Sequence, residues 1–369
     1  METCMDFLNW LERDMAIKIL MCLDDPSDLV RVSTVSRSWH DFVIESGLFK
    51  QLCLRMFPQL SSVARVIESS CRMREPADVG SSSSMEWESL ERDHKVYACL
   101  ARVRGCTSLA VRNCISLAIS ASSTDNYPEE SIDNTLHARD IIAWRPSYWS
   151  SKGQSDPAVP ETLIYKLVSD LCVITEINIH PFQADFQSGS PIYSAKSVRF
   201  QMGHPKSPMN LESDLMGAAC QQSADDKFVW TYNSQEFSMA QENRLQKFEL
   251  PEPVLCIGGI LQIELLGRVQ RQEMDGLFYI CVSHVNVMGH SLSPSFDVQI
   301  LEPSGKFLLE YCPEASNYSP EDEPCARSGV PILPTDLEQQ INVRGWEQIL
   351  IMLRGNPPEV EDNEHDDPD

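Results

Sequence analysis

The residue types that perform catalysis or bind metals are scattered along this chain of 369 residues. His284 and His290 lie six positions apart at the end of a strand-like run, which is weak support for a metal pair among eight dispersed histidines. The sequence contains no C-x-x-C pair, no G-x-S-x-G, no phosphate loop, no G-x-G-x-x-G and no H-E-x-x-H. We therefore expect no catalytic site, no metal and no cofactor.

Aromatic and acidic side chains occur together in the segment "HPFQADFQSGSPIYSA". Phe182, Phe186 and Tyr193 accompany Asp185 there, a combination that suits a sugar face or a basic peptide. A neighbouring loop, "RPSYWSSKGQSDPAVP", is a second candidate, since loops on a rigid scaffold often recognise ligands. The alternative is that these aromatic residues cover the end of a domain, and the sequence leaves both interpretations open.

The cysteines predict a reducing compartment. There are 13 of them, an odd number without disulfide-type or zinc-type spacing. Cys22, Cys172, Cys256 and Cys281 lie in apolar runs and are predicted to be buried thiols. The first residues lack a signal-peptide pattern, and no apolar run approaches about 18 residues. We expect no membrane span, and a cytoplasmic or nuclear location or both.

The net charge of −24 argues against binding to nucleic acid, because such binding depends on Lys and Arg that neutralise phosphates. An acidic surface is compatible with a basic partner or with no particular partner.

These residues must be positioned by two kinds of element. Residues 1–60 show helical spacing, with an apolar stripe that includes Ala16, Ile19 and Leu20, and Asp25 before Pro26 predicts a helix start. Residues 61–114 are predicted to be a linker, marked by four serines at 81–84, followed by a helix. So small a helical unit must pack on the rest of the chain or dock on another protein, because fewer than about 70 residues rarely form a sufficient core.

From about residue 107 the apolar period shortens to that of strands. No helix-length pattern separates these runs, so the sheets are predicted to be antiparallel. Residues 291–331 are predicted to be irregular, a late helix is expected at 335–355, and the acidic tail 359–369 is expected to be disordered.

The N-terminal segment resembles an F-box. The family's Leu-Pro element falls on Leu11, and its Ile-Leu element falls on Ile19 and Leu20. Its Leu-x-Pro-x-Asp-Leu element falls on Leu23, Pro26, Asp28 and Leu29. Its Val-Cys-Arg-x-Trp element falls on Val35, Arg37 and Trp39, and its Leu-Trp-Lys element falls on Leu48, Phe49 and Lys50. The departures are Glu12 for proline, Ser36 for cysteine, Phe49 for tryptophan, and one extra residue before Pro26.

The resemblance implies that these helices dock on the Skp-type adaptor of a cullin–RING ubiquitin ligase. Eight residues would divide between that interface and a small internal core: Leu11, Ile19, Leu20, Pro26, Leu29, Val32, Val35 and Trp39. Trp39 is the kind of large aromatic residue that contributes strongly to binding.

Residues 115–290 resemble the galactose-binding-like, or discoidin, β-sandwich. The order of motifs matches: Ala121–Ser123, Ile132 with Asp133, Trp149–Ser151, Leu163–Leu167 and Ile174–Ile179, with a long insertion near 204–225. In this family, loops at one end bind sugars, lipids, peptides or proteins.

The predicted architecture is therefore α+β and multidomain. A three-helix F-box (1–60), a linker and helix (61–114), a jelly-roll β-sandwich (115–290) and an irregular C-terminal part with a helix and an acidic tail (291–369) follow one another. The resemblances imply a non-catalytic substrate receptor of a Skp–cullin–F-box ubiquitin ligase. The alternative is a non-degradative scaffold that binds carbohydrate or protein while associated with the adaptor.

Overall fold

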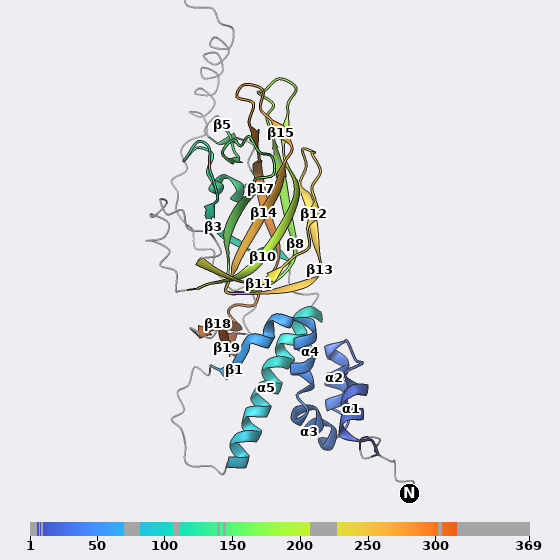
Figure 1. Ribbon diagram of the computed structural model, residues 1–369. Coiled ribbons are helices and arrows are strands. Elements are labelled where there is room, and N and C mark those ends of the chain that lie inside the picture. The colour runs from blue at the N-terminus through green and yellow to red at the C-terminus, as the bar shows by residue number, and fades with distance from the viewer. Residues whose placement is uncertain are drawn as a thin grey trace, which may run out of the picture. The chain divides into compact units, whose positions relative to one another are not determined.

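The computed structural model describes residues 6, 8, 10–69, 82–105, 111–138, 141–142, 145–206, 227–301 and 305–315 (Figure 1). All of them belong to the unit Met1–Asn317, one of two into which the chain divides. Within these residues, no helix is both long and apolar enough to cross a membrane. The predicted late helix, the acidic tail and most of the predicted insertion fall outside the described residues.

The N-terminal part consists of short helices, of which α2 and α3 begin with a side-chain cap. They are α1 (Arg13–Leu20), α2 (Pro26–Ser33), α3 (Arg37–Glu45) and α4 (Leu48–Met56), followed by the 3₁₀ helix η2 (Pro58–Ser62). The Asp25 carboxylate accepts the Ser27 N–H at 2.8 Å, which confirms the predicted helix start at Pro26. Segment 13–56 forms four helices where three are expected, because Gly47 adopts φ 58° and ends α3 before α4 begins.

Two segments predicted to be irregular form a small sheet. Strand β1 (Val63–Glu68) lies in the predicted linker, and β18 (Phe296–Leu301) and β19 (Lys306–Tyr311) lie in the predicted irregular region. β19 pairs with β1 in parallel and with β18 in antiparallel orientation. Strands β18 and β19 form because alternate residues are apolar and can be buried on one face, whereas β1 does not alternate and buries Val66.

Helix α5 (Ser82–Gly105) begins inside the serine run that was predicted to belong to the linker. The sequence predicts a buried stripe of Leu90, Val96, Tyr97 and Leu100 in this helix. Val96, Tyr97 and Leu100 are buried, but the prediction is wrong for Leu90, which is exposed.

The remaining strands form a sandwich of two sheets. One has the order β11-β10-β14-β7-β3 and the other β13-β8-β17-β2. Strands β7, β8, β10, β13, β14 and β17 alternate between the sheets, and β11 pairs with β10 in the same sheet. All these pairs are antiparallel, so the predicted jelly-roll architecture is confirmed. The bounds are β2 (Arg112–Asn113), β3 (Ile115–Ala121), β7 (Glu161–Leu167), β8 (Leu171–Gln183), β10 (Ala195–Pro205), β11 (Phe228–Asn233), β13 (Gln246–Ile257), β14 (Ile260–Arg268) and β17 (Cys281–Ser291).

Short elements complete the sandwich. They are η3 (Ile132–Leu136), β4 (Ile141–Ile142), β5 (Arg145–Pro146), β6 (Trp149–Ser150), β9 (Ile192–Tyr193), β12 (Phe237–Ser238), β15 (Gln270–Arg271) and β16 (Phe278–Tyr279).

The core between the sheets is built from alternating strand residues around Trp149, Tyr165 and Phe200, all of which are fully buried. Three of the four thiols predicted to be buried are buried, those of Cys172, Cys256 and Cys281. Cys22 is exposed instead, because it follows the last turn of α1, where its Sγ contacts the Lys18 carbonyl at 3.3 Å.

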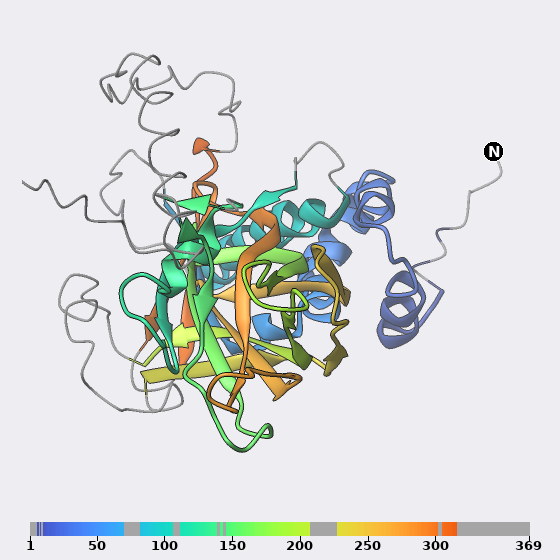
Figure 2. The same cartoon turned by 90° about the horizontal axis from the view of Figure 1, so that it is seen from above.

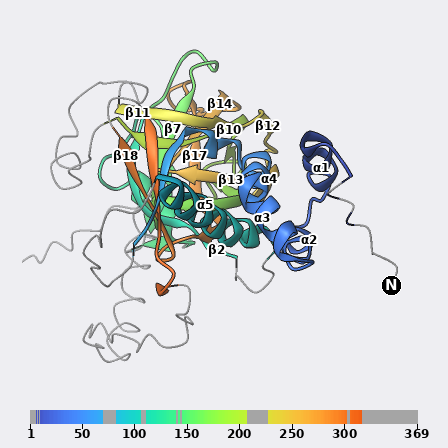
Figure 3. The same ribbon diagram turned by 90° about the horizontal axis from the view of Figure 1, so that it is seen from below.

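A second core joins the N-terminal helices to the sandwich. Leu171 and Val173 of β8, together with Leu255 and Ile257 of β13, pack with residues of α1–α5 and of the small sheet. Figure 3 shows α4 and α5 at this end of the strands. Both faces of β8 and β13 are therefore covered here, which explains why "LCVI" and "VLCI" are continuously apolar rather than alternating. We call this second cluster the shared core.

Candidate functional site

Helix α1 presents two opposite faces. Ala16 and Leu20 are buried, whereas Met15 and Ile19, four residues apart on the same side of the helix, are both more than 40% exposed. An ion pair between Arg13 and Glu45 at 3.4 Å links α1 to α3. The exposed side is therefore an apolar surface on a fixed helix.

The structure separates the eight residues assigned by resemblance to adaptor binding. Leu20, Pro26 and Leu29 are buried, Leu11, Val32 and Trp39 are half-buried, and Ile19 and Val35 are exposed, Val35 by 62%. Trp39 also donates its Nε1–H to Asp6 at 2.9 Å. Trp10, which is 71% exposed, was not among the predicted residues, although an indole in the polar run "LNWLER" was a signal for it.

The opposite end of the sandwich from the shared core is made of loops. Residues 122–131, 183–191 and 272–279 meet there, and we call this region the loop end. In Figure 2, seen from above, the loops after β8 and between β15 and β16 extend side by side. The two loops approach each other closely: the rings of Tyr193 and Tyr279 meet edge to face, with 6.3 Å between their centroids.

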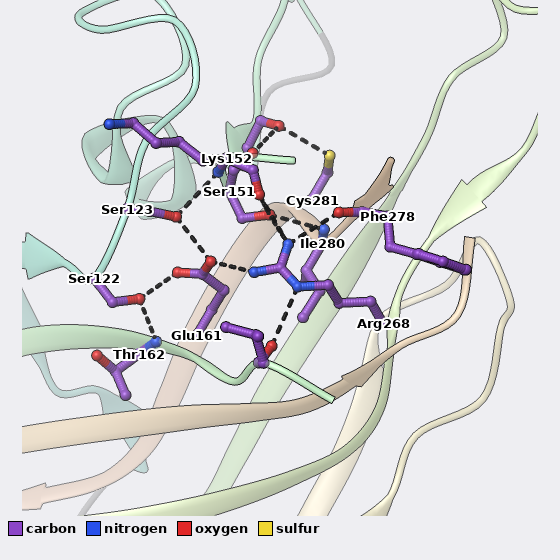
Figure 4. A network of polar contacts seen from close by, with 12 residues as sticks. Ser122, Ser123, Ser151, Lys152, Glu161, Thr162, Arg268, Phe278, Ile280 and Cys281 are labelled. Carbon is purple, nitrogen blue, oxygen red and sulfur yellow. Dashed lines mark hydrogen bonds and ion pairs between the residues drawn. The ribbon is translucent and has the colours of Figure 1, made fainter. Parts of the chain in front are cut away.

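A buried ion pair closes the base of the loop end (Figure 4). The Arg268 side chain is fully buried and binds the carboxylate of Glu161, which is 3% exposed. Arg268 Nη1 also donates to Ser151 Oγ at 2.8 Å and to the carbonyl oxygen of Lys152 at 2.9 Å. Ser123 Oγ donates to the same carboxylate at 2.8 Å, so one network joins the end of β3 to β7 and β14.

The aromatic residues predicted to bind a ligand divide into two groups. Phe182 and Tyr193 are buried and pair across β8 and β9, with the Phe182 ring stacked on Tyr148 at 3.8 Å. For these two residues the prediction of an exposed ligand face is wrong, because they fill the space beneath the loops. Phe186 and Asp185 are exposed, as a ligand-binding role requires.

Sequence reasoning did not identify the carboxylates at the loop end. The Tyr148 hydroxyl donates to Glu130 Oε1 at 2.7 Å, and the Tyr279 hydroxyl donates to Asp275 Oδ2 at 2.5 Å. Burial raises the pKa of the Asp125 carboxyl, and the nearby charges of Glu130 and Asp275 raise it further. Asp275 comes from a loop far in sequence from the one that carries Asp125 and Glu130, which explains why no local motif marks the three acids together.

The described parts of the chain contain no group of three or more His, Cys, Asp or Glu side chains arranged to hold a metal ion. His284, one of the two histidines considered for a metal pair, instead places Nδ1 at 2.9 Å from the carbonyl oxygen of Thr135.

Comparison with known proteins identifies the N-terminal helices. An F-box-like family model matches residues 13–55. An F-box protein of Arabidopsis thaliana is 53% identical over 362 residues, which span 97% of this chain and 95% of that protein. The chain belongs to the F-box protein family. This F-box protein consists of the matched N-terminal helices packed on a β-sandwich.

Solved structures similar to part of this F-box protein include two carbohydrate-binding modules of family 32. The module of Clostridium perfringens NanJ, solved in complex with galactose, is 13% identical and covers 48% of this chain and 99% of its own, with a TM-score of 0.29. The module of Streptococcus pneumoniae EndoD is 11% identical and covers 47% of this chain and 97% of its own, with a TM-score of 0.31.

Proposed function

We propose that this F-box protein is the substrate-recognition subunit of a Skp–cullin–F-box ubiquitin ligase in the cytoplasm or nucleus. The F-box helices would bind the Skp-type adaptor, and the sandwich would capture the protein to be ubiquitinated. The observation that supports this best is the exposure of three apolar side chains, those of Met15, Ile19 and Val35, within the segment matched by the F-box family model.

The exposed side chains favour a protein partner for energetic reasons. Removing an apolar side chain of this size from water contributes about 1.5–3 kcal/mol. Leu20 and Leu29 already fill the shared core, so the exposed side of the helices is free for another protein. The same helices therefore pack on this chain with one face and can dock on an adaptor with the other.

The shared core fixes the distance between the F-box helices and the loop end of the sandwich. Leu171 belongs to the shared core and Phe182 to the cluster under the loops, and both lie on strand β8. At about 3.3 Å per residue, the strand separates them by at most roughly 36 Å. Transfer of ubiquitin would then be accelerated by proximity, because a captured target is held at a raised effective concentration.

The adaptor interface can be tested with a double variant, Ile19→Asp with Val35→Asp, in the full chain. Co-expression with a Skp-type adaptor followed by co-purification measures binding. The matched control is Val168→Asp, which makes the same chemical change at an exposed valine after β7. We expect the double variant to lose the adaptor and the control to retain it; retention by both would overturn the assignment.

A further inference from the structure

We propose that the loop end binds a basic segment of the target protein, in which Lys or Arg side chains meet the carboxylates and neighbouring apolar side chains meet the loop tips. This inference rests on the proposed function, since it names the chemistry that the sandwich would capture. The residues concerned are the acids Asp125, Glu130 and Asp275 and the apolar residues Tyr127, Phe186 and Met274.

Hydrogen bonds hold the Glu130 and Asp275 carboxylates in place. The Tyr279 hydroxyl and the Leu277 N–H lower the pKa of Asp275, and the charge of Arg271 lowers it further. Glu130 Oε1 accepts the Tyr148 hydroxyl, while Glu130 Oε2 is buried and has no hydrogen-bond partner among the described residues. A buried carboxylate oxygen without a partner costs free energy, and a cation held near the carboxylate would offset part of that cost by electrostatic attraction. Asp275 is oriented by Tyr279 and by the Leu277 N–H at 2.9 Å.

The acids act on one another within a loop and between loops. After burial, Glu130 on the same loop and Asp275 on another loop disfavour the charged form of Asp125, and Lys152 is the basic group that opposes them. Gathering like charges in one region is unfavourable in the free protein. A basic ligand relieves this repulsion, whereas a phosphate, a nucleic acid or an anionic lipid surface would increase it.

The loop tips add an apolar component beside the charges. Tyr127, Phe186 and Met274 are 74%, 63% and 94% exposed, and each lies on a different one of the three loops. The Phe186 ring lies beside the buried Phe182 ring, with 6.3 Å between the two ring centroids. This loop tip therefore packs on the hydrophobic cluster that contains Phe182. Exposed apolar side chains next to acids fit a segment in which basic and apolar residues are interspersed.

A sugar fits this end less well than a peptide. A sugar ring needs a free aromatic face, but Phe182 is stacked on Tyr148 and Tyr193 is buried against Tyr279. Of the three aromatic residues that sequence reasoning offered to a sugar, Phe182 and Tyr193 are therefore occupied by other side chains, and Phe186 alone keeps an exposed ring.

The test uses fluorescence anisotropy with the full chain and a labelled peptide of alternating Lys-Leu and Gly-Ser pairs. The variant Asp125→Asn with Asp275→Asn should bind it at least about tenfold more weakly. The control Glu86→Gln with Glu88→Gln removes the same charge from exposed positions on α5 and should bind as the wild type does. A version of the peptide with acetylated lysines should not bind.

Three outcomes would overturn the inference: no binding of the lysine peptide, an equal loss in the α5 control, or binding of galactose or N-acetylgalactosamine that depends on the same two acids. Failure of the proposed function looks different. If Phe186→Ser with Met274→Ser and the acid variant both leave capture of cellular proteins unchanged, the loop end captures no target at all. If the apolar variant alone loses capture, the receptor role stands and the basic ligand is rejected.

Discussion

Ile19 and Leu20 are neighbours in the chain that face opposite surroundings. Leu20 is 5% exposed and packs in the shared core, whereas Ile19 is 44% exposed on the outer side of α1. The helix rotates about 100° per residue, so adjacent apolar residues can serve a core and an interface separately. Within one turn of helix, Leu20 therefore contributes to stability, and Ile19 is available for the proposed adaptor interface.

The first prediction concerns the buried members of the apolar stripe. Leu20→Ala and Leu29→Ala should each lower the free energy of unfolding by about 2–5 kcal/mol, because each leaves a cavity in the shared core. Ile19→Ser should change it by less than about 0.5 kcal/mol. Urea unfolding measures all three, and an unchanged midpoint for both leucine variants would contradict the assigned burial.

The second prediction compares two phenylalanines four residues apart in sequence. Phe182→Ala should destabilise the protein by about 3–5 kcal/mol, because its ring is buried and stacked on Tyr148. Phe186→Ala should be nearly neutral, because most of the Phe186 ring is exposed. Thermal melting of both variants measures the difference, and equal losses would mean that both rings are structural.

The sequence predicts the architecture well where periodicity is local. Alternation in "ETLIYKL" and the antiparallel pairing that follows from it are confirmed, as is the capped start of α2 at Pro26. The hairpin of β18 and β19 had a comparable signal: alternating apolar residues on both sides of Gly305, which adopts φ 63°. Its Pro- and Ser-rich surroundings obscured that signal.

The candidate sites were harder to predict, for a physical reason. The Phe182 ring is covered by Tyr148, and the pKa of Asp125 is raised by burial, then by Glu130 and by Asp275. Tyr148 and Asp275 are distant in sequence from the residues that they affect. The parallel pairing of β1 with β19 likewise joins two ends of the described chain. Such contacts leave no periodicity in a local window, so only the folded structure reveals them.

The third prediction is a pH dependence at His94. The His94 ring packs edge-on against Phe49, with 5.2 Å between the ring centroids. Burial lowers the pKa of His94, and the charge of His40 lowers it further. Because the folded-state pKa lies below the unfolded value near 6.5, protons bind the unfolded chain more readily. Stability from neutral His94 is therefore full above about pH 6.5 and is lost as the pH falls.

The variant His94→Asn should make the melting temperature less sensitive to pH between about 7.5 and 5. His137→Asn, at an exposed position, serves as the control and should keep the sensitivity of the wild type. If His94→Asn melts with the same pH dependence as the wild type, another group causes the acid sensitivity.

The last prediction concerns the buried pair Glu161 and Arg268. All nitrogens of the guanidinium have acceptors: Nε donates to the Val159 carbonyl at 3.2 Å, Nη1 donates to Ser151 and two carbonyl groups, and Nη2 binds Glu161. Lysine has a single nitrogen and cannot reproduce this planar set of donors. Arg268→Lys and Glu161→Gln should each cost about 3–5 kcal/mol of unfolding free energy, because each leaves buried polar groups unsatisfied.

The double variant Glu161→Leu with Arg268→Leu should cost less than the sum of the two single losses, since it removes both buried charges together. The matched control is Glu249→Gln, which breaks an ion pair with Lys247 where both side chains are more than half exposed, and it should leave the free energy of unfolding nearly unchanged because water screens the pair. Urea unfolding supplies the energies, and adaptor co-purification should survive in any variant that stays folded, because the network lies at the far end of β7 and β14 from the helices. Full additivity of the two single losses would show that Glu161 and Arg268 do not stabilise each other.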